Sequence, residues 1–477
     1  MHAELKGGSV THTETPHSAT ENHAAAREEY GLHAGVLGPV ETLAQSVSAM
    51  APSTSSSLTI PLVFALAGNG TWLVYLLATG ATLLVGFCVS RFARISASPG
   101  SLYTYTAEAL PPFFGVTVAW ALLMAYLATG ASVAGGALYY AVLLCEQFLH
   151  WSPNHLATLL AVCALAAAIA YRDVKLSAEV MLWIEAASLC LIVLVLSAIL
   201  YRAGFHIDLQ EVTLRGVHPS ALGPALVLAL FSFVGFESAT TLGAEARDPL
   251  RTIPRAVIQC AVLAGVFFVL CSYSEVLGFR GEPGNLSETT SPLHLLAEKA
   301  GIAGVGVAID FGAGISMFAC VLACIIAAAR VLMRMAHGGL LPAVLAGTSR
   351  RHGTPGYSIG LSAVMMLGMT SGLALRGVRG EEMYDLLGSL AVFGFLTAYT
   401  LIAIALPFAR RAVGQHSMVV AGLCIVTVAV MILITVFDLR STTDAAHARL
   451  PLIYLCYLAV GIGWYALAGW RLNRTPR

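Results

Sequence analysis

Two acidic residues of this sequence lie within apolar stretches, where a carboxylate can carry a proton or hold a charged ligand. Glu237 follows Gly235 closely, and the basic, proline-containing segment Arg247 to Arg255 comes next. Glu185 lies in the apolar stretch Met181 to Leu189. A mid-membrane carboxylate costs roughly 2.5 to 3.5 kcal/mol on insertion scales, and glycine costs about 1 kcal/mol relative to alanine in a helix. We therefore expect the function to require these residues.

The composition predicts an all-α polytopic membrane protein. Hydrophobic residues make up 57% of the chain and charged residues only 11%, whereas an ordinary soluble protein has about 25% charged residues. A spanning helix needs about 20 mainly apolar residues. Twelve segments meet this need, at 38–67, 72–94, 113–146, 155–171, 178–201, 221–242, 255–278, 303–335, 357–375, 384–409, 418–438 and 451–470.

The basic residues predict which side of the membrane each loop faces. If both termini are cytoplasmic, most of the 26 Lys and Arg residues fall in the termini and inner loops, as the positive-inside rule requires. We expect a multi-pass protein of the plasma membrane. The formal net charge is zero, so composition gives no sign of a nucleic-acid partner.

Histidine and cysteine residues give no metal-ligand pattern. Residues 1–34 are polar and histidine-rich, and they are expected to form a disordered cytoplasmic tail; irregularly spaced histidines there could also bind a metal. The ten cysteines fall within or at the ends of apolar spans, where a free thiol behaves as a small hydrophobe. We expect no disulfide, no structural metal and no organic cofactor.

Two of the predicted spans carry an interruption. The first contains the polar run Gln45 to Ser57 with Pro52 in the middle, and proline removes a helical hydrogen bond. The sixth is interrupted between Ser232 and Glu237. Five spans separate the two interruptions, as expected if spans 1 to 5 and 6 to 10 are inverted repeats. Paired discontinuous helices indicate a transporter's binding site near the middle of the membrane, whereas either break alone is as well explained by a packing kink.

Several segments together resemble the amino acid–polyamine–organocation permeases. The resemblance runs from about residue 35 to 411. It rests on Gly235-Phe-Glu237 with the following loop to Arg255, on Ser98 to Tyr105, on Arg330 to Pro342 with Thr354-Pro355, and on Leu387 to Tyr399.

The resemblance implies a LeuT-like fold of two inverted five-helix repeats, with helices 1 and 6 discontinuous. Residues 35–411 would form the transport core, and 412–477 two further helices and a short cytoplasmic tail. Family members carry amino acids and related amines by alternating access, driven by protons or by exchange. By analogy the substrate would contact the two breaks, with Phe231 or Phe236 as a gate; as isolated residues both aromatics fit a core role better than a gate. The implied binding residues are Ser46, Ser48, Ala49, Pro52, Ser53, Phe231, Ser232, Gly235 and Phe236.

Two positions depart from the family pattern. Ser48 to Ser53 lacks the glycine-rich break of many relatives, and Glu185 stands where many relatives place a lysine. We hypothesise that Glu185 is the proton-coupling site; the alternative is a structural link between helices. For Glu237 we favour a structural or gating role at the helix-6 break, although it could also receive a substrate amine.

Other acidic residues are expected to cost less free energy to place in the membrane. Glu275 and Asp310 lie near predicted membrane boundaries, where water would reach them. Glu245 could form a cytoplasmic gate network with Arg247, Arg251 and Arg255, although a role of this basic loop in setting the topology would be sufficient to explain it.

Other functions fit the same sequence in part. An amino-acid exchanger and a polyamine or organic-amine transporter would need the same breaks, and a nutrient sensor built on this fold would keep them. A metal-ion transporter would require Asp, Asn and Met at the breaks, where only Met50 matches in part. A membrane enzyme is disfavoured because no HExxH or GxSxG motif occurs in the spans. The identity of the substrate, the coupling ion and the oligomeric state are left open by the sequence.

Overall fold

The structure is a computed structural model. It describes residues 30–472 apart from 34, 97, 173, 281–285, 290, 350, 413, 415–416 and 441–445, and only the backbone of residues 174–182, 412 and 468–472. Most of the predicted N-terminal tail, residues 1–29 and 34, lies outside the described residues.

The described chain is helical, and ten of its stretches are long and apolar enough to cross a membrane. This confirms the prediction of an all-helical polytopic membrane protein. One stretch, Pro39–Ala93, holds the first two predicted spans. The others are α7 (Pro112–Leu149), α8 (His155–Arg172), α9 (Val174–Arg202), α12 (Pro249–Gly278), α14 (Ala303–His337), α15 (Gly356–Ala374), α16 (Gly380–Ala412), α17 (Met418–Arg440) and α18 (Leu450–Leu472).

The predicted twelve spans and the ten observed stretches differ for two reasons. The first two spans are joined by a tight helical turn at Gly68–Gly70, after which α5 runs over Thr71–Ala93. The sixth span is represented by α11, Pro219–Phe231, which is too short to cross by itself. The count of twelve therefore stays a prediction.

The first predicted interruption lies at Ala51. Helix α2 (Pro39–Met50) ends there because Ala51 takes a left-handed conformation with φ of 46°. The chain resumes at Pro52 with α3 (Pro52–Thr54), the π-helical turn η1 (Ser55–Thr59) and α4 (Ile60–Ala67). Proline is tolerated at the first position of a helix because its missing N–H would have no intrahelical partner there. Pro52 thus restarts the helix after the break.

The second interruption begins where α11 ends at Phe231. Turns cover the next residues as far as Glu237, and the 3₁₀ segment η3 (Ser238–Leu242) follows. Helix α12 starts only at Pro249. The sixth predicted span is therefore broken at its centre, as the sequence indicated.

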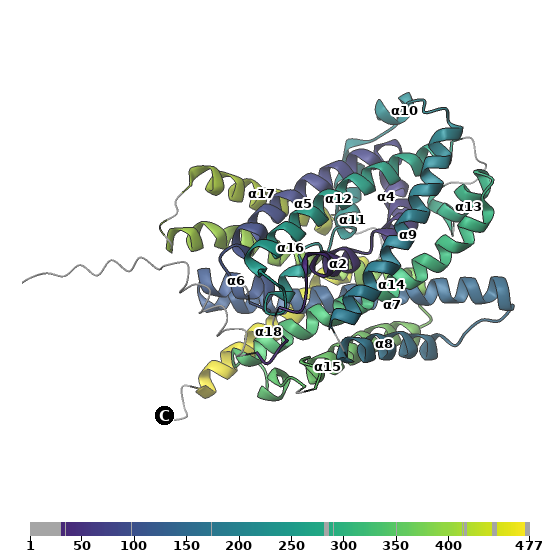
Figure 1. Cartoon of the computed structure of the whole chain (residues 1–477). Helices are drawn as coiled ribbons and strands as arrows, with labels where there is room; N and C mark the ends of the chain where they lie inside the picture. The colour runs from purple at the N-terminus through teal and green to yellow at the C-terminus, as the bar shows by residue number, and fades with distance from the viewer. Residues whose placement is uncertain are drawn as a thin grey trace, which may run out of the picture.

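The interrupted helices lie inside a layer of uninterrupted ones (Figure 1). Helix α5 packs along α12, α7 packs along both α14 and α16, and α2 contacts α9, α12 and α14. Helix α8 pairs with α15, while α17 and α18 pack against α16 from outside. The short helices α6 (Ser101–Ala109) and α10 (Leu209–Val212) mark opposite ends of the bundle, called here the α6 end and the α10 end.

Candidate functional site

The two helix interruptions touch each other. Gly235 has φ of 92°, a conformation that L-residues rarely adopt, and a Cβ atom placed on it would lie 2.9 Å from the carbonyl oxygen of Ala49. Two hydrogen bonds also join the segments: Ser238 Oγ donates to Gln45 O over 3.1 Å, and the Ala239 N–H donates to Ser46 Oγ over 3.0 Å. Glycine is required because the two backbones meet here.

Glu185 reaches the first interruption from α9. Its carboxylate accepts hydrogen bonds from the Ser53 backbone N–H over 3.1 Å and from Ser53 Oγ over 3.0 Å. Its other oxygen accepts from the hydroxyl of Ser316 on α14. The side chain is buried at 1% exposure. Glu185 therefore connects three elements, α3, α9 and α14, at the point where the first helix restarts.

Glu237 sits at the second interruption with different partners. Its two oxygens accept hydrogen bonds from the hydroxyls of Tyr126 on α7, over 2.8 Å, and Tyr399 on α16, over 2.6 Å. All three side chains are buried. The carboxylate thus ties the break to the two helices that flank it.

The predicted substrate residues divide into two groups. Ser46, Ser53, Ser232 and Gly235 already make contacts at or beside the breaks, Ser232 with the hydroxyl of Tyr75 over 3.1 Å. Ala49 and Pro52 are buried at the first break. By contrast, the hydroxyl of Ser48 is buried with no hydrogen-bond partner among the described residues. An incoming polar ligand could supply that missing bond.

Phe231 and Phe236 occupy different environments. Phe231 packs edge-on against Tyr384 of α16, with ring centroids 5.6 Å apart. Both residues line a narrow gap in the structure. Phe236 is buried at 1% exposure against Tyr399. Phe231 therefore borders a space, whereas Phe236 is packed into the core. Phe231 is the better candidate for an aromatic gate.

The α6 end is closed by a buried ion pair and a backbone pairing. Arg330 of α14 donates two hydrogen bonds of 2.7 Å to the carboxylate of Glu245, and both side chains are buried. Leu37 pairs with Ala246 in a parallel bridge. The expected gate partners of Glu245 were wrong: Arg247 instead donates to Gly35 O, and Arg251 lies 3.7 Å from Asp248.

The α10 end is hollowed. A cavity of about 450 Å³, called here the vestibule, has polar lining residues Tyr384, Glu288, Arg379, Glu381, Glu382 and Asp385. Tyr384 and Asp385 also line the narrow gap that contains Phe231. The vestibule and the gap lined by Phe231 therefore meet at Tyr384 and Asp385.

Two further acidic residues, which the sequence predicted to be accessible to water, are buried. Glu275 of α12 is fully buried, and neither of its oxygens has a hydrogen-bond partner among the described residues. Asp310 of α14 is 2% exposed and lies 2.6 Å from His294 Nδ1. Within the described residues no three acidic, cysteine or histidine side chains gather as a metal site.

Some partners at the site had no signal in the sequence. Ser316 and Tyr126 are ordinary residues of long apolar helices, and only packing brings them to the acids they bind. Arg330 begins a segment that resembled the family, but its bond to Glu245 was not predicted. Tyr399 belongs to a segment that resembled the family, but its bond to Glu237 was not predicted.

Comparisons with known proteins give a consistent result. A family model described as amino acid permease matches residues 54–475. A branched-chain amino acid permease of Bacillus subtilis is 24% identical, over 72% of this chain and 74% of its own length. A low-affinity putrescine importer of Escherichia coli is 26% identical, over 69% of this chain and 71% of its own. A methylthioribose transporter of Bacillus subtilis is 24% identical, over 72% and 74% respectively.

Proposed function

This chain belongs to the amino acid permease family and is a multi-pass membrane transporter, and from that premise we propose that it moves an amino acid or a related amine by alternating access. The observation that carries the proposal is the contact between the two helix interruptions at Ala49 and Gly235. Interrupted helices leave N–H groups and carbonyls unpaired, and these can bind the carboxylate and the ammonium of one small ligand.

The order of the helix contacts supports an inverted repeat. The first and sixth predicted spans carry the breaks, and the second and seventh, α5 and α12, pack together. The third and eighth, α7 and α14, also pack together. Each pair is related by a shift of five spans, as expected for repeats of spans 1 to 5 and 6 to 10.

Differences between the two ends of the bundle support an orientation in the membrane and a conformational state. The α6 end carries Arg91, Arg94, Arg330 and Arg410, which favours a cytoplasmic location under the positive-inside rule. This end is closed by the Glu245 and Arg330 pair, whereas the vestibule hollows the α10 end. We assign the conformation as outward-facing, in a plasma membrane with cytoplasmic termini.

Glu185 is the proposed proton-coupling residue. It is buried, and the hydroxyls of Ser53 and Ser316 around it can each donate or accept a hydrogen bond. Such partners can satisfy both the ionised and the neutral carboxyl group. Because Ser53 directly follows the first break, a change in the charge of Glu185 would act on the substrate site.

An organic amine is the second candidate substrate, and the charge of the vestibule favours it. Four carboxylates and one guanidinium, that of Arg379 paired with Glu381 and Glu382, line this cavity. Carboxylates are therefore in excess, and an excess of negative charge in a cleft raises the local concentration of cations. A putrescine importer among the relatives agrees with this reading. Phe231 and Tyr384 offer aromatic faces for a cation.

The test measures ligand binding first and transport of the bound ligand second. Purified protein would be screened by thermal shift against amino acids, polyamines and carboxylates, because a ligand at 100 times its dissociation constant stabilises the folded form by about 2.7 kcal/mol. The best ligand would then be followed as a radiolabelled solute into liposomes. Saturable uptake supports the proposal. Binding without either uptake or exchange would favour a nutrient sensor, and no stabilisation across the panel would contradict the assignment of substrate class.

A further inference from the structure

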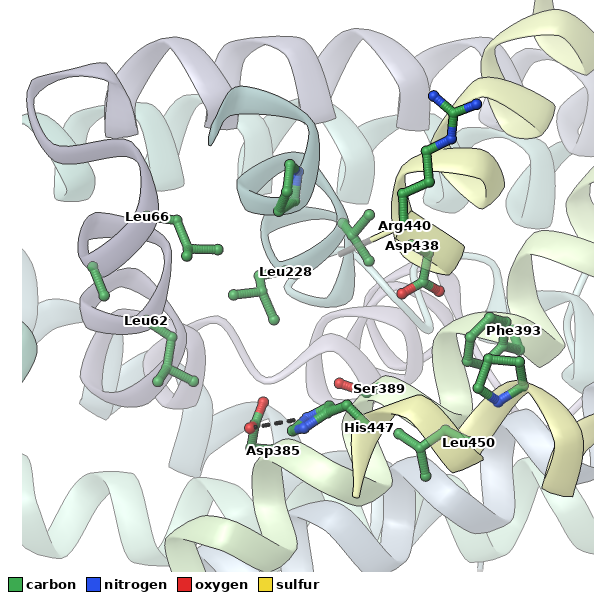
Figure 2. Close-up of a pocket in the computed structure, with 14 residues that line it drawn as sticks. Leu62, Leu66, Leu228, Asp385, Ser389, Phe393, Asp438, Arg440, His447 and Leu450 are labelled. Atoms are coloured by element: carbon green, nitrogen blue, oxygen red, sulfur yellow. Dashed lines mark ion pairs between the residues drawn. The ribbon is translucent and has the colours of Figure 1, made fainter. Parts of the chain in front are cut away.

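A second cavity lies beside the vestibule, between the transport core and the last two helices. It has a volume of about 410 Å³ and is lined by α4, α11, α16, the end of α17 and the start of α18 (Figure 2). We call it the lateral pocket. It lies at the α10 end and away from the contact between Ala49 and Gly235. It shares Leu62, Leu228 and Asp385 with the gap that contains Phe231.

One side of the lateral pocket is acidic. Asp385 of α16 and Asp438 of α17 both line it, and His447 lies between the helices with Nε2 3.2 Å from an Asp385 oxygen. The Asp385 side chain is 32% exposed, so a ligand can reach it. Arg440 also lines the pocket, but its guanidinium points away from Asp385 and His447 in Figure 2. This side of the pocket therefore favours a cation.

The opposite side of the lateral pocket is apolar. Leu62 and Leu66 of α4 and Leu228 of α11 face the acidic groups across the space (Figure 2). Phe393 of α16 adds an aromatic ring to the lining. Ligand pockets of roughly 300 to 1,000 Å³ with apolar walls and a few polar groups suit small molecules. The pocket combines apolar walls with a few charged groups.

We propose that the lateral pocket is a second binding site, separate from the helix breaks, for a primary amine with an apolar body. The ammonium group would lie at Asp385 and Asp438, and the apolar body against Leu62, Leu66 and Leu228. The ligand of this site need not be the transported substrate.

Occupancy of the lateral pocket is coupled to transport. Its walls belong to α4 and α11, the halves of the interrupted helices on the α10 side, and to α17 and α18. A ligand that bridges these walls holds α4 and α11 against the last two helices. Closure of the α10 end requires these half-helices to move, so the ligand lowers the maximum rate of transport without competing for the breaks. This consequence rests on the proposed function.

The experiment measures binding first. Phenethylamine is titrated by calorimetry into the purified full chain, with 2-phenylethanol and 3-phenylpropanoate as matched ligands that lack the ammonium group. Leu66→Trp fills the pocket, and Asp438→Asn removes one carboxylate. Leu76→Trp, at an exposed leucine of α5, is the control for added bulk.

We expect phenethylamine to bind and the two control ligands to bind at least about tenfold more weakly, because they leave the carboxylates without a charged partner. Leu66→Trp should abolish binding and Asp438→Asn should weaken it about tenfold or more, while Leu76→Trp leaves it unchanged. Absence of binding to the wild-type chain, or binding that persists in both pocket variants, would overturn the proposal.

Transport assays then distinguish failure of the lateral site from failure of the proposed transport function. Phenethylamine should lower the maximum uptake rate of the best substrate with unchanged KM, and Leu66→Trp should relieve the inhibition. Competitive inhibition that both pocket variants retain would place the amine at the breaks and overturn the lateral site. If no solute is transported but both pocket variants lose binding, the site stands and the transport proposal fails.

Discussion

The two buried acids at the helix breaks have partners of different kinds. Glu185 is held by two serines and a backbone N–H, and Ser53 and Ser316 also bond to each other over 2.7 Å. Glu237 is held by two tyrosines from neighbouring helices. Small hydroxyl groups can rotate to follow a change of protonation, whereas two packed tyrosine rings fix a carboxylate in place. This contrast supports the proposal that Glu185 carries the mobile proton and that Glu237 anchors the break.

Replacement of Glu185 tests the proton role directly. Glu185→Gln keeps the size of the side chain and its capacity to accept from Ser53, but it cannot release a proton. We expect accumulation driven by a pH gradient in liposomes to fall to the level reached without the gradient, while exchange across the membrane continues. Uptake that keeps its full response to the gradient would instead make Glu185 a structural link.

Gly235 tests the contact between the breaks. Gly235→Ala would place a methyl group 2.9 Å from Ala49 O in a backbone with φ of 92°, which costs about 1 to 3 kcal/mol in strain alone. We expect a lower unfolding temperature and a loss of uptake. Gly422→Ala in α17 is the control, because no atom lies within 4 Å of its added carbon. If both variants unfold at the wild-type temperature, close contact between the two breaks is not needed for stability.

At the level of the elements, the segment before α2 is bonded to the segment after η3, and the latter is bonded to α14. Leu37 N–H donates to Glu245 O over 3.1 Å, and Arg247 N–H donates to Leu37 O over 2.7 Å. Glu245 also binds Arg330 of α14 through its side chain. Both broken helices are therefore tied to one continuous helix at the α6 end, and opening this end requires these bonds to separate.

Glu245→Gln should open and destabilise the α6 end. It leaves the Arg330 guanidinium buried without a carboxylate, which typically costs about 3 to 5 kcal/mol. We expect a lower unfolding temperature and faster thiol labelling of Cys320, which is buried and donates to Ala49 O at the break. The exposed Cys190 and Cys456 would first be replaced by alanine.

The double variant Glu245→Leu/Arg330→Met provides the control for that experiment. It removes both charges, so the stability loss should be smaller than in Glu245→Gln. If both variants label Cys320 at the wild-type rate, the ion pair does not close this end.

For the whole molecule, the loop that contains α10 joins three parts of the chain at the vestibule end. Asp208 binds Arg280 over 2.6 Å, and Arg280 binds Asn69 in the turn between α4 and α5. Trp72 donates to the backbone oxygen of Glu211 over 3.1 Å. The Glu211 carboxylate itself is buried and has no hydrogen-bond partner among the described residues. Stability of this end should therefore depend on pH.

Burial, aided by the nearby charge of Asp208, raises the pKa of Glu211 to about 8 from its ordinary 4.5. The folded chain then keeps a proton that the unfolded chain releases, so the contribution to stability is full below pH 4.5, falls as pH rises from 4.5 to 8, and is absent above. We expect Glu211→Gln to flatten this part of the profile of unfolding temperature against pH. The exposed Glu146→Gln is the control, and parallel profiles for wild type and Glu211→Gln would contradict the assignment.

The sequence by itself determined the class of the protein, its helical segments and the places where two of them break. These are local properties: a membrane needs a fixed length of apolar chain, Pro52 cannot continue a helix, and Gly235 permits a backbone that other residues resist. It also singled out Glu185 and Glu237 because a carboxylate in an apolar segment is costly wherever the segment packs.

Only the tertiary structure decided what these residues bind. Glu185 meets Ser316 across 131 positions of sequence, Glu237 meets Tyr399 across 162, and Glu245 meets Arg330 across 85. The lateral pocket likewise exists only where five helices meet. Partners so far apart depend on the rotation and depth of each helix against its neighbours, and hydrophobic pattern alone leaves both undetermined, because an apolar surface faces lipid as readily as another helix.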